Sequence, residues 1–107
     1  MSTIIGNKPI KVIQGATKDI RRKFDTEVTQ NIASVVISCN ELGLNFTLDK
    51  TENGEFTHRL SSSLTATFAP QTTTYDMTVT YTDGSVGIET GIPFVVEERI
   101  NPIGGNI

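Results

Sequence analysis

The sequence has few of the residues from which covalent staples and metal sites are built. Its 107 residues include one cysteine, one histidine and no tryptophan. A single cysteine cannot form an internal disulfide, and a structural zinc site needs about four Cys or His ligands. Cys39 ends the apolar run of residues 35–39, which predicts a buried and unreactive thiol.

Catalytic constellations are also missing. His58 alternates with Phe56 and Leu60, which favours packing in a sheet face over general-base catalysis. The nearby serines, residues 61–63, form a hydroxyl cluster of the kind that hydrogen-bonds the backbone at a turn. The acidic residues 49, 52 and 55 flank a turn but do not have the spacing of a calcium loop. We therefore predict a protein that is not an enzyme and that uses no cofactor or metal.

Long hydrophobic runs and strong charge are absent as well. No run approaches the roughly 18 apolar residues of a membrane-spanning helix, and residues 1–6 lack the basic start of a signal peptide. The net charge is −3, whereas nucleic-acid-binding domains usually carry net positive charge. We expect neither a membrane nor a nucleic-acid partner, and folding in a reducing cytoplasm.

The charges that are present lie unevenly along the chain. Residues 1–23 hold six Lys and Arg against one Asp, a balance of +5, and residues 24–107 hold three against eleven acids, a balance of −8. Such a chain can bind a copy of itself head to tail, or dock onto an acidic neighbour. The alternative is a basic edge strand that resists sheet-to-sheet aggregation. The candidate docking residues are Lys8, Lys11, Lys18, Arg21, Arg22 and Lys23.

Alternating apolar and polar residues predict a series of short β-strands. In the second strand, Ile20, Arg22 and Phe24 share one face, and the Arg22 head group is expected to reach water. The third is continuously apolar, which is typical of a central strand buried on both faces. The expected strands in the first part of the chain are residues 10–13, 20–26, 32–39, 44–49 and 55–60.

Two glycine turns organise the rest of the chain. Asn53-Gly54 and Asp83-Gly84 are hairpin signals that need positive φ angles. Around the second turn, an alternating strand from residue 75 to 81 precedes an apolar run at 92–96, in which Pro93 must lie at an edge or a strand start. Residues 61–69 fit either a strand or a serine-capped helical turn, and their threonine content favours the strand.

Roughly seven short strands predict an all-β fold, an immunoglobulin-like antiparallel β-sandwich. The Cys-Trp-Cys core of antibody domains is absent. We expect an N-terminal arm at residues 1–9, the sandwich at 10–100 and a flexible C-terminal tail at 101–107.

Four segments carry a resemblance to a known family: residues 13–17 (IQGAT), 74–77 (TYDM), 83–86 (DGSV) and 93–96 (PFVV). With these, the chain resembles the phage virion Ig-like domains that begin baseplate upper proteins of Gram-positive phages, and the related head-decoration and fibre-anchoring proteins. The resemblance implies a non-enzymatic structural protein, made in the host bacterial cytoplasm and assembled into the virion. Its partners would be other virion proteins and copies of itself, contacted through sheet edges and arms.

Two alternative functions fit the same fold. One is an Ig-like module of a bacterial surface or adhesive protein. The other is a carbohydrate-binding β-sandwich, but such sites usually present exposed aromatic rings. This chain has two Tyr and five Phe, mostly at positions in phase with the core.

Overall fold

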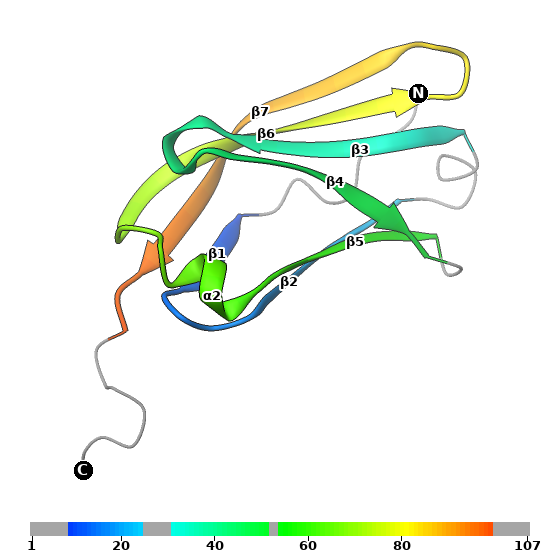
Figure 1. Cartoon of the computed structure of the whole chain (residues 1–107). Coiled ribbons are helices and arrows are strands. Elements are labelled where there is room, and N and C mark those ends of the chain that lie inside the picture. Colours follow the sequence, from blue (N-terminus) through cyan, green and yellow to red (C-terminus); the bar gives the residue numbers. More distant parts are fainter. Residues whose placement is uncertain (1–8, 25–30, 52–53, 100–107) are drawn as a thin grey trace.

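The computed structural model describes residues 9–24, 31–51 and 54–99, so the predicted arm, except Pro9, and the tail lie outside the described residues. The described part is all-β, as predicted, with seven strands and short helical turns (Figure 1). None of its helices is long and apolar enough to cross a membrane. The strands are β1 (Ile10–Ile13), β2 (Lys18–Lys23), β3 (Ile32–Cys39), β4 (Leu44–Lys50), β5 (Glu55–Leu60), β6 (Gln71–Tyr81) and β7 (Val86–Glu97).

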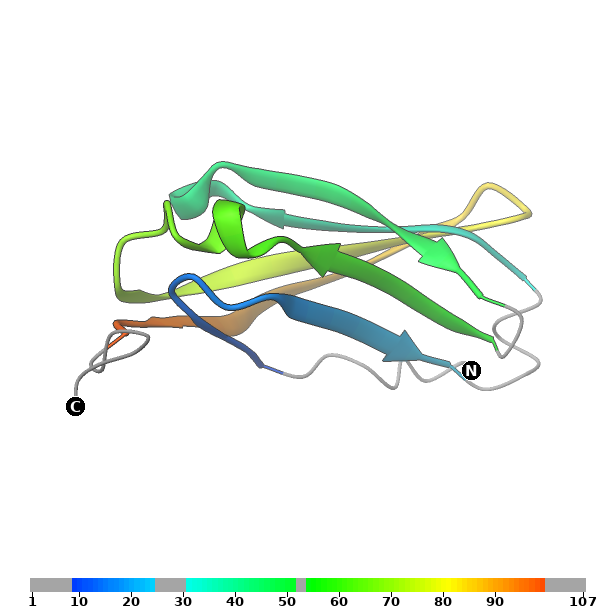
Figure 2. The same ribbon diagram turned by 60° about the horizontal axis from the view of Figure 1, so that its bottom comes forward.

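The strands are hydrogen-bonded in the order β1-β7-β6-β3-β4-β5-β2. β4 belongs to both layers of the sandwich, because it pairs with β3 through Leu44–Leu48 and with β5 through Asp49 and Lys50. β2 and β5 therefore form a layer apart from β3, β6 and β7 (Figures 1 and 2). All pairs are antiparallel except β1 with β7, which is parallel. The immunoglobulin-like sandwich is thus confirmed.

The core lies between the two layers and is built from alternate residues of every strand. Ile20 and Phe56 come from the β2–β5 layer, whereas Ile37, Met77 and Phe94 come from the other. Each is at most 1% exposed, and full burial of one such side chain stabilises the fold by roughly 1.5–3 kcal/mol. This two-layer burial leaves one face of each sheet in water.

The two predicted glycine turns are present. Gly54 and Gly84 have φ angles of 79° and 91°, although Asn53 lies outside the described residues. At the second turn, the Gly84 N–H donates to the Tyr81 carbonyl at 2.9 Å, and the Asp83 carboxylate accepts from the Ser85 N–H at 2.8 Å. The hairpin from β6 to β7 therefore turns at Asp83-Gly84 as predicted, although only Gly84 has a positive φ.

β7 is longer and less regular than the sequence indicated. It begins at Val86, not at the apolar run that starts at Ile92. Its register against β6 shifts between Tyr75 and Met77, where Gly91 has a φ of 70°. A β-bulge of this kind puts two residues opposite one and bends the strand. Pro93 follows the bulge, one residue before pairing with β1 begins, so β7 has a free side there, as predicted.

Residues 61–69 form a short helix and a turn rather than the favoured strand. α2 (Ser62–Thr65) is capped by Ser61, whose hydroxyl accepts from the Leu64 N–H at 3.2 Å. The Thr65 hydroxyl, buried, donates to the Ala16 carbonyl at 2.9 Å. Local capping and this buried hydrogen bond outweigh the β-propensity of the threonines.

β3 has the predicted bounds and lies within the sheet, but it is buried on one face only. Val35 and Ile37 are fully buried, whereas Ala33 is exposed and Val36 is half-buried. Among the described residues, no second layer covers the outer face of this strand, so the prediction of burial on both faces was wrong. A short 3₁₀ turn, η1 (Asn40–Leu42), and Gly43 with a φ of 66° then reverse the chain, as expected.

Candidate functional site

The outer face of the β2–β5 layer carries most of its charged side chains. Strand alternation turns Ile20, Phe56 and Leu60 into the core and the residues between them outward. The register then pairs residues of opposite charge across the strands, Asp19 with Arg59 and Lys23 with Glu55. We call this surface the charged face; its ionised residues are Asp19, Arg21, Lys23, Asp49, Glu55 and Arg59.

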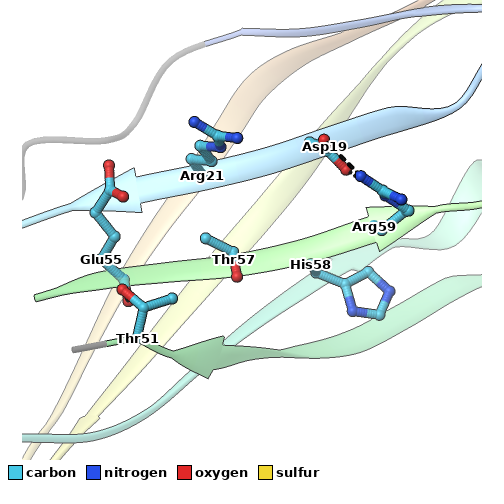
Figure 3. Close-up of a pocket in the computed structure, with 7 residues that line it drawn as sticks. All are labelled: Asp19, Arg21, Thr51, Glu55, Thr57, His58 and Arg59. Carbon is cyan, nitrogen blue, oxygen red and sulfur yellow. Dashed lines mark hydrogen bonds and ion pairs between the residues drawn. The ribbon is translucent and has the colours of Figure 1, made fainter. Parts of the chain in front are cut away.

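A two-point ion pair fixes one end of the charged face. Arg59 Nε donates to Asp19 Oδ1 at 2.7 Å, and Arg59 Nη2 donates to Asp19 Oδ2 at 3.2 Å (Figure 3). The hydrogen bond from Arg59 holds the pKa of Asp19 below its usual value, and the same bond raises the pKa of Arg59. Both side chains are exposed, so solvent screens the pair and its contribution to stability is small.

An open groove of about 400 Å³ runs beside this ion pair (Figure 3). Glu55 and Thr51 lie at the end away from the Asp19–Arg59 pair, and Arg21 and Thr57 lie between the two ends. Anionic, cationic and hydroxyl groups alternate along it, which suits a polar protein segment better than a small apolar ligand. The full lining is Asp19, Arg21, Thr51, Glu55, Thr57, His58 and Arg59.

The predicted docking residues do not form one surface. Lys18, Arg21 and Lys23 lie on β2, with Arg21 and Lys23 exposed. Lys11 lies on β1 in the other layer, with its ammonium 3.3 Å from the Glu97 carboxylate. Lys8 lies outside the described residues. The predicted outward orientation of Arg21 and Lys23, opposite to the buried Phe24, is confirmed.

Arg22 must be removed from the docking set. It is 5% exposed, so the prediction that its head group reaches water was wrong. Its guanidinium donates to the Tyr75 hydroxyl at 2.5 Å and to the Arg21 carbonyl at 2.7 Å. Alternation with Ile20 and Phe24 points Arg22 into the sandwich, where these acceptors replace water. Burial raises the pKa of Tyr75, and the hydrogen bond from Arg22 opposes this effect.

His58 and Cys39, the two residues considered for catalysis, metal binding or thiol reactivity, are packed against other side chains. His58 stacks on Phe46, with ring centroids 4.3 Å apart and ring planes 15° apart, as predicted for a sheet-face histidine. Within the described ranges, no group of three or more His, Cys, Asp or Glu side chains could hold a metal ion. Cys39 is 1% exposed, and burial raises the pKa of its thiol. Its burial is confirmed, and its unreactivity stays a prediction.

The outer face of the other layer has very different chemistry. The register aligns Ile88, Thr78, Val36 and Thr47 in one row across four strands. These four residues contain no ionisable group, and we call this row the neutral row. Ile88 and its neighbour Val86 are 60% and 55% exposed. Neither was predicted from the sequence to be an exposed surface residue, although the alternation Val86-Gly87-Ile88 was a signal for the strand that carries them.

No family model and no curated protein matches this chain. A solved structure of fibronectin(III)-like modules of Clostridium thermocellum CbhA is similar, with a TM-score of 0.59 and 14% sequence identity. The match covers 94% of this chain and 48% of that one, so the chain spans about half the length of the similar structure. At this identity the likeness concerns the fold alone, which is that of a fibronectin III-like, immunoglobulin-like β-sandwich module.

Proposed function

We propose that this chain is a non-catalytic module that works by binding other proteins. The observation that carries the proposal is the basic edge of β2, on which Arg21 and Lys23 are exposed and Lys18 is half-buried. Within the described ranges, no carboxylate lies within ion-pair distance of these three side chains. Cations that make no close ion pair, on a strand that pairs only with β5 among the described strands, favour encounter with an acidic surface.

The acidic surface that fits this edge belongs to a neighbouring subunit. The charge split of the chain supports a partner of similar composition, because residues 24–107 carry a balance of −8. Opposite charges of this kind speed association and set orientation more than they raise affinity. We propose the charged face and the β2 edge together as the docking surface.

For the setting, we propose a phage virion, in which the protein serves as a capsid-decoration, fibre-anchoring or baseplate accessory protein. The sequence resemblance described above supports this setting, and a charged docking edge suits assembly among subunits. The observation that favours the alternative, a module of a bacterial surface or adhesive protein, is the similar bacterial fibronectin(III)-like structure. Neighbouring capsid, portal or tail genes would support the virion, and a neighbouring sortase gene would support the surface protein.

The experiment reverses the charge of the β2 edge. The double variant Arg21→Glu/Lys23→Glu should fold normally but fail to enter virus particles of the phage whose genome encodes it, at physiological salt. The control Lys50→Glu/Arg99→Glu reverses two exposed cations outside β2 and makes the same change in net charge. Normal incorporation of the β2 variant would overturn the docking proposal, and equal failure of both variants would reduce it to a non-specific charge effect.

A further inference from the structure

The first half of β7 is a sheet edge with no strand on its outer side in the described part of the chain. β7 pairs with β6 from Val86 to Val96, but with β1 only from Phe94 to Glu97. Figure 1 draws this half of β7 along the outer margin of its sheet. Backbone N–H and C=O groups on such an edge are a template for another strand.

This edge has fewer residues that hinder the addition of another strand than the edges formed by β1 and β2. β1 carries Lys11, and β2 carries three exposed or half-exposed cations. From Val86 to Glu89, before the β-bulge at Thr90 and Gly91, there is no lysine, arginine or proline, residues that usually block strand addition. Val86 and Ile88 are instead the two most exposed large apolar side chains in the described part of the chain.

We infer that this edge pairs with the same edge of a second copy of the chain, antiparallel about a two-fold axis at Ile88. In this register Ile88 faces Ile88 of the second copy, and Val86 faces Thr90. The one ionisable residue of the segment, Glu89, faces Gly87, so the two carboxylates do not oppose each other. A two-fold interface needs a self-complementary surface, and this register provides one.

Charge favours pairing with the same β7 edge of a second copy over pairing with the β2 edge of a second copy. Pairing with the basic β2 edge of another copy would set Ile88 beside Arg21 or Lys23, which remain better solvated in water. Pairing of two β7 edges also joins the neutral rows, so that Ile88, Thr78, Val36 and Thr47 continue into their counterparts across one sheet. The contact is short, so we expect a dissociation constant on the order of 10–100 µM.

The first test is the mass of the protein in solution. Sedimentation equilibrium of the full chain from about 1 µM to about 1 mM should follow a monomer–dimer equilibrium. Ile88→Lys sets two ammonium groups opposite each other and should weaken the dimer by about tenfold or more. Ile13→Lys, which changes another exposed apolar residue on β1, should leave it unchanged. A wild-type protein that stays monomeric throughout, or equal loss in both variants, overturns the inference.

The second test reads the register. Directly opposed residues of antiparallel strands have Cα atoms about 4.5–5.5 Å apart, which a disulfide can span. Ile88→Cys should therefore form a covalent dimer under mild oxidation by air, because two surface thiols meet and the buried Cys39 does not compete. Val86→Cys, which faces Thr90, should link much more slowly. Equal linking of both variants overturns the register.

An edge covered by residues 1–8 of the same chain would give the opposite result. The Ile88→Cys variant would then stay monomeric under oxidation, which also overturns the inference. Dimer formation and subunit docking remain separable. The Arg21→Glu/Lys23→Glu variant should still dimerise, since its changes lie on the other edge.

Discussion

Neither the β2 edge nor the first half of the β7 edge has a strand on its outer side in the described part of the chain, but their side chains differ in kind. β2 presents cations, and the ion pair between Asp19 and Arg59 joins it to the neighbouring strand. The β7 edge presents Val86 and Ile88 beside one glutamate. A charged edge resists a second identical strand, because like charges would face each other. An apolar edge has no such charges, so we propose different partners for the two edges, an acidic surface for β2 and a second β7 edge for β7.

The comparison also shows how differently the edges are stabilised. β2 is held by the side chain of Arg22 inside the sandwich and by an ion pair outside it. The β7 edge is held by the turn at Gly84 and the bulge at Gly91, that is, by backbone conformation. Substitutions on β2 should therefore act through burial and charge, and substitutions near the β7 edge through backbone strain.

The largest effect is expected inside β2. Arg22→Ala removes a buried guanidinium and its hydrogen bond to the Tyr75 hydroxyl, and should lower the free energy of unfolding by about 2–4 kcal/mol. Arg21→Ala, one residue away on the outer face, should change it by less than about 0.5 kcal/mol. Urea unfolding of both variants measures the difference. Similar losses would mean that Arg22 is as solvated as its neighbour.

A smaller effect is expected at the start of the β7 edge. Gly84→Val should cost about 1–2 kcal/mol, because a β-branched residue is strained at a φ of 91°. Gly87→Val is the matched control, since an added Cβ there meets the Tyr81 ring at 3.7 Å, an ordinary contact. Thermal unfolding should separate the two variants by several degrees. An unchanged melting temperature for Gly84→Val would place the strain elsewhere.

The smallest expected effect is the response to salt and pH of the stability contributed by Asp19 on β2 and by Asp83 in the turn before β7. Asp19 has a lowered pKa because of Arg59, and Asp83 has a lowered pKa because of hydrogen bonds from Ser85. A lowered carboxyl pKa stabilises the fold above the ordinary value of about 4, and this stabilisation is lost as the pH falls through the lower folded value.

The deficits of Asp19→Ala and Asp83→Ala relative to wild type should therefore both shrink at about pH 2. At neutral pH, about 1 M NaCl should reduce the Asp19→Ala deficit more than the Asp83→Ala deficit, because salt screens the exposed ion pair between Asp19 and Arg59. Urea unfolding at the two salt concentrations measures this. An equal salt response would show that the ion pair between Asp19 and Arg59 makes no salt-sensitive contribution to the free energy of unfolding.

Period-two alternation and glycine turns predicted the strands, the hairpins and the sandwich. These signals are local, so they could be read along the chain. Arg22 was misplaced because its burial depends on Tyr75, 53 residues away, whose hydroxyl accepts its hydrogen bond. The absence of a described strand beside the first half of β7 could not be predicted either, since it depends on how far β1 extends along β7. Local patterns fix which face a residue occupies, but not what lies across from it.

The parallel pairing of β1 with β7 has a mechanical consequence. Ile10 lies opposite Phe94 and Ile13 opposite Glu97, so the chain enters the ladder at one end and leaves it at the other. Tension between the two ends of the chain therefore loads the hydrogen bonds of this ladder in shear, all together rather than one after another. A module placed between two partners in this way resists extension at the small β1–β7 ladder before its core is stretched.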